Sequence, residues 1–380
     1  MITAEYTFCP PDTYPLERIG CPEKLLFFDI ETTGFSASGS SLYLIGAASV
    51  SGGVWHLTQW FADRAGSEEE ILQAFFSHLA PFDTLVHFNG DTFDIPYLEK
   101  RCEILGLSCP LKELKSWDIY KKIRPLKKLL GLESLKQKAI EQFLGIERED
   151  RYSGGQLIEV YHRYLTSRDE NLCRLLLLHN EEDLKGMPLI LPILLYPDFL
   201  SGSFSPVQWE LREETDIFGQ KEHILEMVCQ SEATLPRPFS WEHPFLPGVR
   251  FQAEENRLSL SLPLFEGELK YFYPNYKDYY YLVYEDTAIH KSVGEYVDRD
   301  ARKKATAATC YTRKTGLFLP QPEPASGPVF RTDYRSGICY REFPSDPLSC
   351  PDFPDYISAL ITSGLGRGLR TPKKKKTISR

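Results

Sequence analysis

The sequence contains no CxxC pair, no long apolar run and no excess of positive charge. Its nine cysteines are scattered and odd in number, so we expect reduced thiols in a reducing compartment, and zinc is not implied. No apolar run approaches the roughly 20 residues that span a bilayer. The first residues, MITAEYTFCPPDTYP, lack a basic stretch followed by an apolar one, so no signal peptide is expected. We therefore expect a cytoplasmic protein that does not bind membranes.

The net charge of the chain is -9, with 42% hydrophobic and 26% charged residues. These fractions are ordinary for a soluble protein, and a length of 380 residues predicts about two domains. A negative chain is unlike a protein that coats nucleic acid through a broad basic surface. It does not exclude an enzyme acting on nucleic acid, because a carboxylate metal site is acidic and needs only a local basic rim.

Four segments differ in composition. Residues 1–23 are rich in proline and turn formers and predict an irregular lead-in. Residues 24–199 carry strand and helix patterns, and YPDFLSGSFSPVQ marks a boundary rich in Pro, Gly and Ser. Residues 205–365 show alternation and dense tyrosine, which predict a smaller β-rich domain of unknown role. Residues 366–380 form a basic tail that we expect to be disordered.

The pattern of residues 24–199 predicts an α/β domain. KLLFFDI is a short apolar run typical of a buried central strand, and two β-rich runs separated by Ser51, Gly52 and Gly53 favour a hairpin. A helix, a second short strand (DTLVHF) and another helix follow, and the pattern from about Ser134 to Leu195 is helical. This order suits a sheet with helices packed on its faces.

Two acids end the most apolar strand. Asp29 and Glu31 stand two residues apart, so their side chains point to the same face. Two neighbouring buried carboxylates are costly unless a cation compensates them, and Mg²⁺ or Mn²⁺ prefers such oxygens. The alternative is a pair of polar residues where a strand meets a loop.

Two further motifs carry acids. In HFNGDTFD, Asp94 follows Asn89 by five residues and stands at the start of a predicted helix, where it could instead cap the helix. In LLLLHNEEDL, His179 and Asp183 are four residues apart and share one helix face. An inward-facing acid on an apolar helix is unusual without a partner, although a polar helix edge remains the alternative.

FFDIETTGF, HFNGDTFD and HNEED resemble, in order and spacing, the three exonuclease motifs of DnaQ-type proteins in the ribonuclease H-like superfamily. The bacterial YprB-like group of predicted exonucleases is especially similar. The resemblance covers about residues 24–195. It implies a ribonuclease H-like mixed sheet flanked by helices, and a 3′–5′ exonuclease that acts on nucleic acid, DNA or RNA, mostly as single strands.

The resemblance also implies the roles of individual residues. Asp29, Glu31, Asp94 and Asp183 match the acids that hold two divalent cations, Mg²⁺ or Mn²⁺. His179 stands where such enzymes carry the residue that orients the attacking water, and it is the candidate general base. The sequence departs from both common subtypes here, because a histidine occupies the spacing usual for a tyrosine.

Candidate substrate contacts surround these motifs. They comprise residues next to the acids and a basic cluster whose alternative is a solvated helix face: Thr32, Asn89, Phe93, Lys121, Lys122 and Arg124. Two other functions stay open. One is a non-catalytic nucleic-acid-binding or scaffold protein that retains the fold, and the other is a structure-specific endonuclease.

Overall fold

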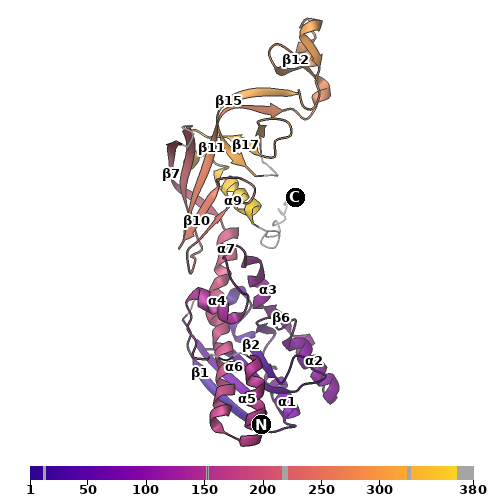
Figure 1. Ribbon diagram of the computed structural model, residues 1–380, viewed down its shortest axis with the longest axis vertical. Coiled ribbons are helices and arrows are strands. Elements are labelled where there is room, and N and C mark those ends of the chain that lie inside the picture. The colour runs from indigo at the N-terminus through magenta and orange to yellow at the C-terminus, as the bar shows by residue number, and fades with distance from the viewer. Residues whose placement is uncertain (12–13, 151, 153, 216–220, 323–326, 366–380) are drawn as a thin grey trace. The chain divides into compact units, whose positions relative to one another are not determined.

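The computed structural model divides the chain into two compact units, Met1–Leu195 and Tyr196–Arg380 (Figure 1). It describes all residues except 12–13, 151, 153, 216–220, 323–326 and 366–380. The predicted disorder of the tail therefore lies outside the described residues.

A six-stranded mixed sheet forms the centre of the first unit, with the strand order β1-β4-β3-β2-β5-β6. Strands β1 to β4 pair antiparallel, whereas β2, β5 and β6 run parallel to one another. The central strand β2 is apolar over its first four residues, as a strand covered on both faces must be. The strands are β1 (Ile2–Phe8), β2 (Leu25–Thr32), β3 (Leu42–Ser51), β4 (Val54–Phe61), β5 (Thr84–His87) and β6 (Lys115–Asp118).

The prediction of an irregular lead-in over residues 1–23 is wrong for its first part. Ile2–Phe8 forms β1 and pairs with β4 along its whole length, from Ile2 opposite Phe61 to Phe8 opposite Trp55. The prolines that suggested a loop, at positions 10, 11, 15 and 22, all come after this strand. The segment ITAEYTF alternates weakly because it is an edge strand, so sequence pattern alone gave little sign of it.

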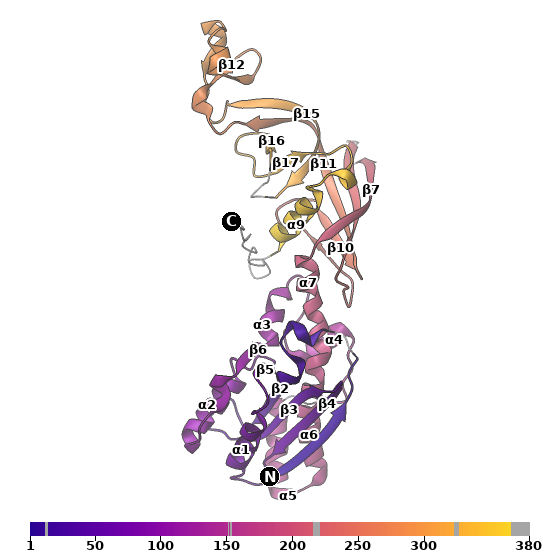
Figure 2. The same ribbon diagram turned by 180° about the vertical axis from the view of Figure 1, so that it is seen from behind.

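Helices cover both faces of the sheet, as the alternation of β2 side chains requires (Figures 1 and 2). Phe28 points to the face where α1 lies, and its ring stacks on Phe75 at 5.8 Å. Asp29 points to the opposite face and meets Asn180 of α6. The helices of this unit are α1 (Glu68–His78), α2 (Asp94–Leu105), α3 (Ile119–Ile123), α4 (Gln137–Leu144), α5 (Gly154–Ser167) and α6 (Glu170–Ile190).

The boundary between the units is helical. The segment YPDFLSGSFSPVQ, rich in turn formers, was predicted as a domain boundary, and its first part lies within α7 (Leu195–Ser201), which follows α6 after one short 3₁₀ turn. Phe199 and Tyr196 are fully buried, and this burial outweighs the local preference of proline and serine for turns. Among the described residues, Glu170–Ser201 is the one helical stretch long and apolar enough to cross a membrane. A core helix also passes that test, and 67% of its apolar window is buried inside the protein.

The second unit is mainly antiparallel β-structure. It contains an eight-stranded sheet and a separate three-stranded sheet, β13-β12-β14. Besides α7, this unit contains the helices α8 (Lys291–Gly294) and α9 (Phe353–Gly364). Helix α9 contacts β7 and buries residues such as Ile357 and Leu360, and the sequence did not predict it. The strands are β7 (Phe204–Thr215), β8 (Lys221–Ser231), β9 (Phe239–Glu242), β10 (Arg250–Glu254), β11 (Arg257–Phe272), β12 (Tyr279–Leu282), β13 (Thr287–His290), β14 (Arg302–Lys304), β15 (Tyr311–Gln321), β16 (Phe330–Arg331) and β17 (Cys339–Glu342).

Candidate metal centre

The central strand β2 delivers the first two acids to the face covered by α6. Asp29 accepts a hydrogen bond from the Nδ2 of Asn180, with 2.9 Å between Nδ2 and Oδ2. Asn180 is fully buried, and its Oδ1 accepts a second hydrogen bond of 2.9 Å from Gln59 of β4. The amide of Asn180 thus connects α6 to two strands and fixes the carboxylate of Asp29.

A glycine opposite Asp29 permits this contact. Gly46 of β3 pairs with Asp29, and a Cβ atom at position 46 would lie 2.0 Å from the Oδ1 of Asn180 and 2.4 Å from Leu184. Neither distance is possible for real atoms. Helix α6 therefore approaches the sheet closely because β3 has no side chain at this point.

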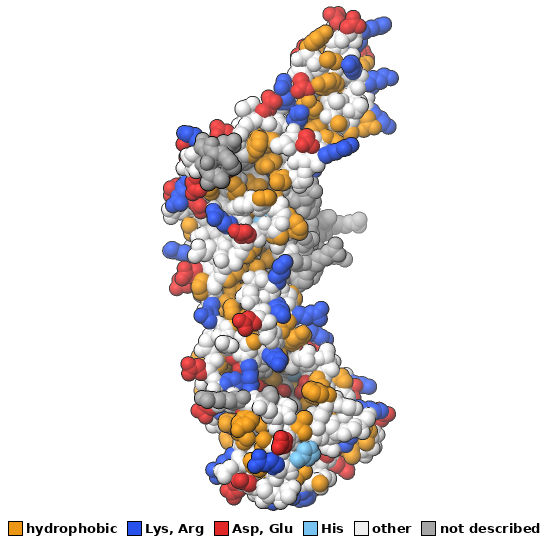
Figure 3. Space-filling view, in the orientation of Figure 1, with side chains coloured by type: hydrophobic (Ala, Val, Ile, Leu, Met, Phe, Trp, Pro, Cys, Tyr) orange, Lys and Arg blue, Asp and Glu red, His pale blue; other side chains and the backbone are white. Residues whose placement is uncertain are grey.

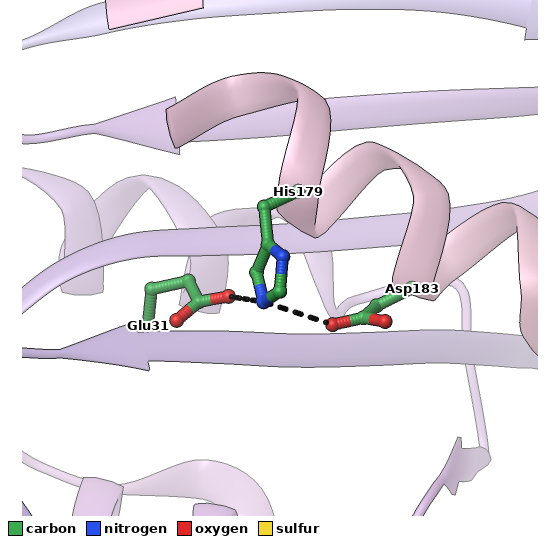
Figure 4. Close-up of side chains that lie close together, drawn as sticks. All are labelled: Glu31, His179 and Asp183. Atoms are coloured by element: carbon green, nitrogen blue, oxygen red, sulfur yellow. Dashed lines mark ion pairs between the residues drawn. The ribbon is translucent and has the colours of Figure 1, made fainter. Parts of the chain in front are cut away.

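His179 lies between Glu31 and Asp183 (Figure 4). Its Nε2 is 3.5 Å from the Oε1 of Glu31 and 3.5 Å from the Oδ2 of Asp183. Ligand atoms of all three side chains lie within 4.8 Å of one another. The four-residue spacing on α6 places His179 and Asp183 on one helix face, as the sequence predicted, and β2 supplies Glu31 from the other side.

Asp94 completes the group as the first residue of α2. Its side chain is buried, although the helix has no side-chain cap and Asp94 is not a capping residue. Burial raises the pKa of Asp94 to about 7, and the negative charges of Asp118 and Asp183 add to this effect. Hydrogen bonds from the backbone amides of Asp94 and Ile30 act in the opposite direction and lower the pKa. The structure thus brings Asp94 next to β2 and α6.

The acids raise one another's proton affinity. Burial is the largest reason that the pKa values of Asp29 and Glu31 lie well above their ordinary range, and Asp183 and Asp94 add to it in both cases. Among the described residues, no Lys or Arg forms an ion pair with Asp29, Glu31 or Asp94. Arg148 pairs with Asp183, and the amide of Asn180 donates to Asp29. The other described groups that converge here are carboxylates and one imidazole, and carboxylate oxygens suit hard divalent cations.

Two neighbouring residues were missed in the sequence. Asp150, which follows α4, forms a hydrogen bond with His179, with 2.6 Å between its Oδ2 and the Nδ1 of the ring. Arg148 makes a 2.7 Å ion pair with the Oδ1 of Asp183 and a 3.1 Å pair with Glu141. Burial lowers the pKa of Arg148, but the attraction of Asp183 and Glu141 outweighs it and raises the pKa overall. Both residues belong to the charged string IERED, which has no recognisable motif spacing.

The predicted substrate contacts lie in several places around this centre. The hydroxyl of Thr32 donates to the carbonyl of Gly34 at 2.9 Å, so it shapes the loop after β2. Asn89 has a positive φ of 65° and donates its amide to Asp118. Phe93 is half-buried, and its ring contacts that of Phe35 at 6.2 Å. Phe35 is 89% exposed and was not among the predicted substrate contacts.

The basic residues lie on α3 and just after it. Lys121 is exposed and paired with Asp91, and Lys122 lies over the ring of Trp117 at 5.8 Å. Arg124 is exposed directly after α3. On the face of the molecule in Figure 3, Lys and Arg side chains alternate with acidic ones. Over the described residues, the face in Figure 3 therefore carries no broad basic surface.

A recess of 570 Å³ adjoins the centre. Its lining includes Phe88, Asn89, Tyr120, Lys127 and Gln137. The Nε2 of Gln137 donates to the backbone carbonyl of Asp183 at 2.8 Å, so one lining residue contacts the main chain of an acid of the centre. A larger recess of 730 Å³ lies between α5 and the start of α6, and none of the clustered acids lines it.

Comparison with known proteins identifies the fold. Residues 26–194 match the model of a family described as the RNase_H superfamily. These residues therefore have the ribonuclease H-like fold, with a mixed sheet flanked by helices, and a separate antiparallel β-rich domain follows, as predicted. The chain is also 34% identical over 97 residues to a DNA polymerase of Pyrococcus glycovorans; the match covers 23% of this chain and 12% of that protein.

Two solved structures are similar at low scores. The family B DNA polymerase of the archaeon Pyrobaculum calidifontis is 18% identical with a TM-score of 0.38, and the match covers 47% of this chain and 25% of that one. A zinc-bound complex of E. coli ExoI with single-stranded DNA is 13% identical with a TM-score of 0.26, and the match covers 55% of each chain. TM-scores this low carry no conclusion about the function of this chain.

Proposed function

We propose that this chain is a metal-dependent nuclease of the DnaQ type, close to the YprB-like group. It hydrolyses phosphodiester bonds of nucleic acid as a 3′–5′ exonuclease on single strands. The observation that carries the proposal is the convergence of Asp29, Glu31, Asp94 and Asp183 from three separate elements. The first three of these acids have no Lys or Arg ion-pair partner among the described residues.

The donor set fits two divalent cations, Mg²⁺ or Mn²⁺. Asp29, Glu31, Asp94 and Asp183 would hold them, since carboxylate oxygens are the preferred ligands of these ions. When bound, the cations supply Lewis-acid stabilisation of negative charge on the reacting phosphate. A non-catalytic binding protein has no use for carboxylates that repel one another in this way, because their repulsion destabilises the fold.

His179 is the proposed general base. Its Nε2 faces the acids, as Figure 4 shows, and would accept a proton from the attacking water. The water oxygen then bonds to phosphorus, the bond to the 3′ oxygen breaks, and the leaving oxygen takes a proton from solvent.

Aromatic side chains beside the acids suit single strands. Phe35 is almost fully exposed and meets Phe93, the residue before Asp94. An unpaired base can stack on such rings, whereas a base inside a duplex cannot. The recess of 570 Å³ adds Phe88, Tyr120 and Lys127, and its lining residue Gln137 contacts the main chain of Asp183. Lys121, Lys122 and Arg124 are the proposed phosphate contacts.

A ladder assay tests the proposal. DNA and RNA oligonucleotides, labelled at the 5′ end or internally, are incubated with Mg²⁺, Mn²⁺ or EDTA. We expect products that shorten stepwise from the 3′ end, only with metal, and none with the Glu31→Gln variant. A single internal cut would show an endonuclease instead. Binding without cleavage under every metal condition would show a non-catalytic protein.

The His179→Ala variant distinguishes a catalytic role of His179 from a purely structural one. We expect turnover to fall by about 10²–10⁴, the usual effect of a positioned acid–base group. The affinity for Mg²⁺ should change little, because histidine is not its preferred ligand. A lower melting temperature with near-normal turnover per folded molecule would make His179 a core histidine with no part in the reaction.

A further inference from the structure

The ring of His179 is held from behind by a second carboxylate. The Nδ1 of His179 and the Oδ2 of Asp150 are 2.6 Å apart, and the Asp150 side chain is fully buried. The opposite ring nitrogen, Nε2, faces Glu31 and Asp183 at 3.5 Å each. The imidazole thus has one edge occupied by Asp150 and the other directed at the proposed metal centre.

The surroundings of Asp150 favour its charged form. Lys138 of α4 lies 2.9 Å from the same Oδ2, and the backbone amide of Tyr152 donates to Oδ1 at 3.0 Å. Burial raises the pKa of Asp150, but the hydrogen bonds from Lys138, Tyr152 and His179 outweigh burial and hold the pKa below its ordinary value. An ionised carboxylate accepts hydrogen bonds and cannot donate them.

The same helix that carries His179 also anchors Asp150. The backbone amides of Glu149 and Asp150 donate to the two carboxylate oxygens of Glu182, at 2.9 and 2.7 Å. Glu182 stands three residues after His179 on α6. The position of Asp150 is therefore fixed relative to the ring that it contacts.

We propose that Asp150 is a positioning residue that keeps the proton of the neutral His179 ring on Nδ1 and leaves the lone pair of Nε2 facing Glu31 and Asp183. Because Asp150 can only accept, the proton in the 2.6 Å contact belongs to Nδ1. In this tautomer Nε2 can accept a proton from water, and Asp150 stabilises the imidazolium that forms. The same logic operates in the Ser-His-Asp triad. The catalytic consequence rests on the proposed nuclease function; the tautomer does not.

Nitrogen NMR of the full chain, labelled with ¹⁵N-histidine, tests the tautomer without any substrate. The His179 signals are assigned by their loss in His179→Ala, and spectra are recorded with Mg²⁺ at a pH where the ring is neutral. We expect a protonated Nδ1 and an unprotonated Nε2. A ring protonated at Nε2 in the native protein would overturn the proposal.

Kinetics test the positioning role. Asp150→Asn removes the charge, and we expect kcat to fall by about 10²–10⁴ with KM and Mg²⁺ affinity changed less than about threefold. Glu182→Ala is the matched comparison, because it releases the same segment without touching His179. We expect a lower melting temperature and a far smaller loss of kcat. Equal losses of kcat in both variants would show that Asp150 only anchors the segment.

The two proposals fail in different ways. If the native protein cleaves no oligonucleotide although the NMR spectrum shows the expected tautomer, the nuclease function is wrong and the positioning of the ring stands. If the native protein is an active nuclease and Asp150→Asn has normal kcat, the positioning role is wrong and the nuclease function stands.

Discussion

The two units of this chain bury different kinds of side chain. In Met1–Leu195 the buried residues include six carboxylates: Glu31, Glu68, Asp94, Asp118, Glu141 and Asp150. In the described part of Tyr196–Arg380 the buried polar residues are Ser231, His243 and Gln321, and none is an acid. Since burying a charge costs free energy unless it is paired, the first unit carries a cost that the second avoids.

Most of the buried acids in the first unit are paired. Glu68 bonds to Arg101, Glu141 pairs with Arg148, and Asp118 caps α3. Glu31 and Asp94 form no ion pair with Lys or Arg among the described residues, and they are the ones that meet at β2. Burial alone therefore does not indicate chemistry. Buried acids that face one another do.

The largest expected effect is that of Asp29→Asn on turnover. The variant keeps the shape of the side chain and removes one proposed metal ligand. Metal stabilisation of the reacting phosphate amounts to several kcal/mol, so we expect kcat to fall about 10³-fold or more in the ladder assay. Asp169→Asn, an exposed cap of the same helix that carries Asp183, is the control and should retain its activity. Normal turnover in Asp29→Asn would remove β2 from the reaction.

A core substitution in the second unit should affect stability alone. Phe318 is fully buried against Leu269 and Phe330, and Phe318→Ala should destabilise that unit by about 3–5 kcal/mol. Calorimetry measures this loss, and isothermal titration with Mn²⁺ measures metal affinity. We expect metal affinity to be unchanged. A weaker metal site in this variant would mean that the second unit helps to form it.

Removing a repelling acid should stabilise the metal-free first unit. The pKa of Asp94 is about 7 in the folded protein and 3.8 ordinarily, so the folded state holds its proton more tightly than the unfolded state. Its contribution to stability is complete below about pH 4 and is lost as pH rises through about 7. At pH 8 in EDTA, Asp94→Asn should therefore melt several degrees above the native protein.

The melting temperatures of Asp94→Asn at lower pH and in the presence of metal are the controls. The gain in melting temperature should shrink towards pH 4, where the native carboxyl is already protonated. Mg²⁺ or Mn²⁺ at pH 8 should stabilise the native protein more than the variant. A variant less stable than the native protein at pH 8 in EDTA would contradict the mutual repulsion of the acids.

The smallest expected effect concerns the basic rim. Lys121→Ala, made in the inactive Glu31→Gln background, should weaken oligonucleotide binding several-fold and reduce the slope of log affinity against log salt by about one. Lys100→Ala is the matched control, because Lys100 is a partly exposed lysine on α2 that is also paired with an acid. Equal salt slopes in both variants would assign Lys121 to its ion pair with Asp91 alone.

The sequence predicted the elements whose burial pattern is strong. The apolar run of β2 and the helical spacing of His179 and Asp183 were sufficient to predict these two elements. Burial on both faces of a strand, or along one stripe of a helix, produces a clear pattern of apolar residues in the sequence. Strand β1 was missed because an edge strand has little burial to show. Helix α7 was missed because tertiary packing of Tyr196 and Phe199 outweighs turn-forming neighbours.

The sequence predicted less of the surroundings of the acids. Asp150 lies 29 residues before His179, in a segment whose position depends on hydrogen bonds to Glu182. Asn180 is next to His179 in the chain, but its contact with Asp29 depends on how closely α6 approaches the sheet. Long-range contacts of this kind leave no period in the sequence. Phe35 could have been found, since it directly follows the DIETTG string.

Gly46, which has no side chain, determines how closely helix α6 approaches the sheet at the site. The strand half of the site, Asp29 and Glu31, and the helix half, His179 and Asp183, belong to different layers. The distance between these layers depends on Gly46 of β3. Asn180 packs directly against its backbone, and a methyl group at position 46 would lie 2.0 Å from the Oδ1 of Asn180. A residue without any functional group thus sets the spacing of the carboxylates. Gly46→Ala should move the two halves apart while leaving every acid in the sequence unchanged.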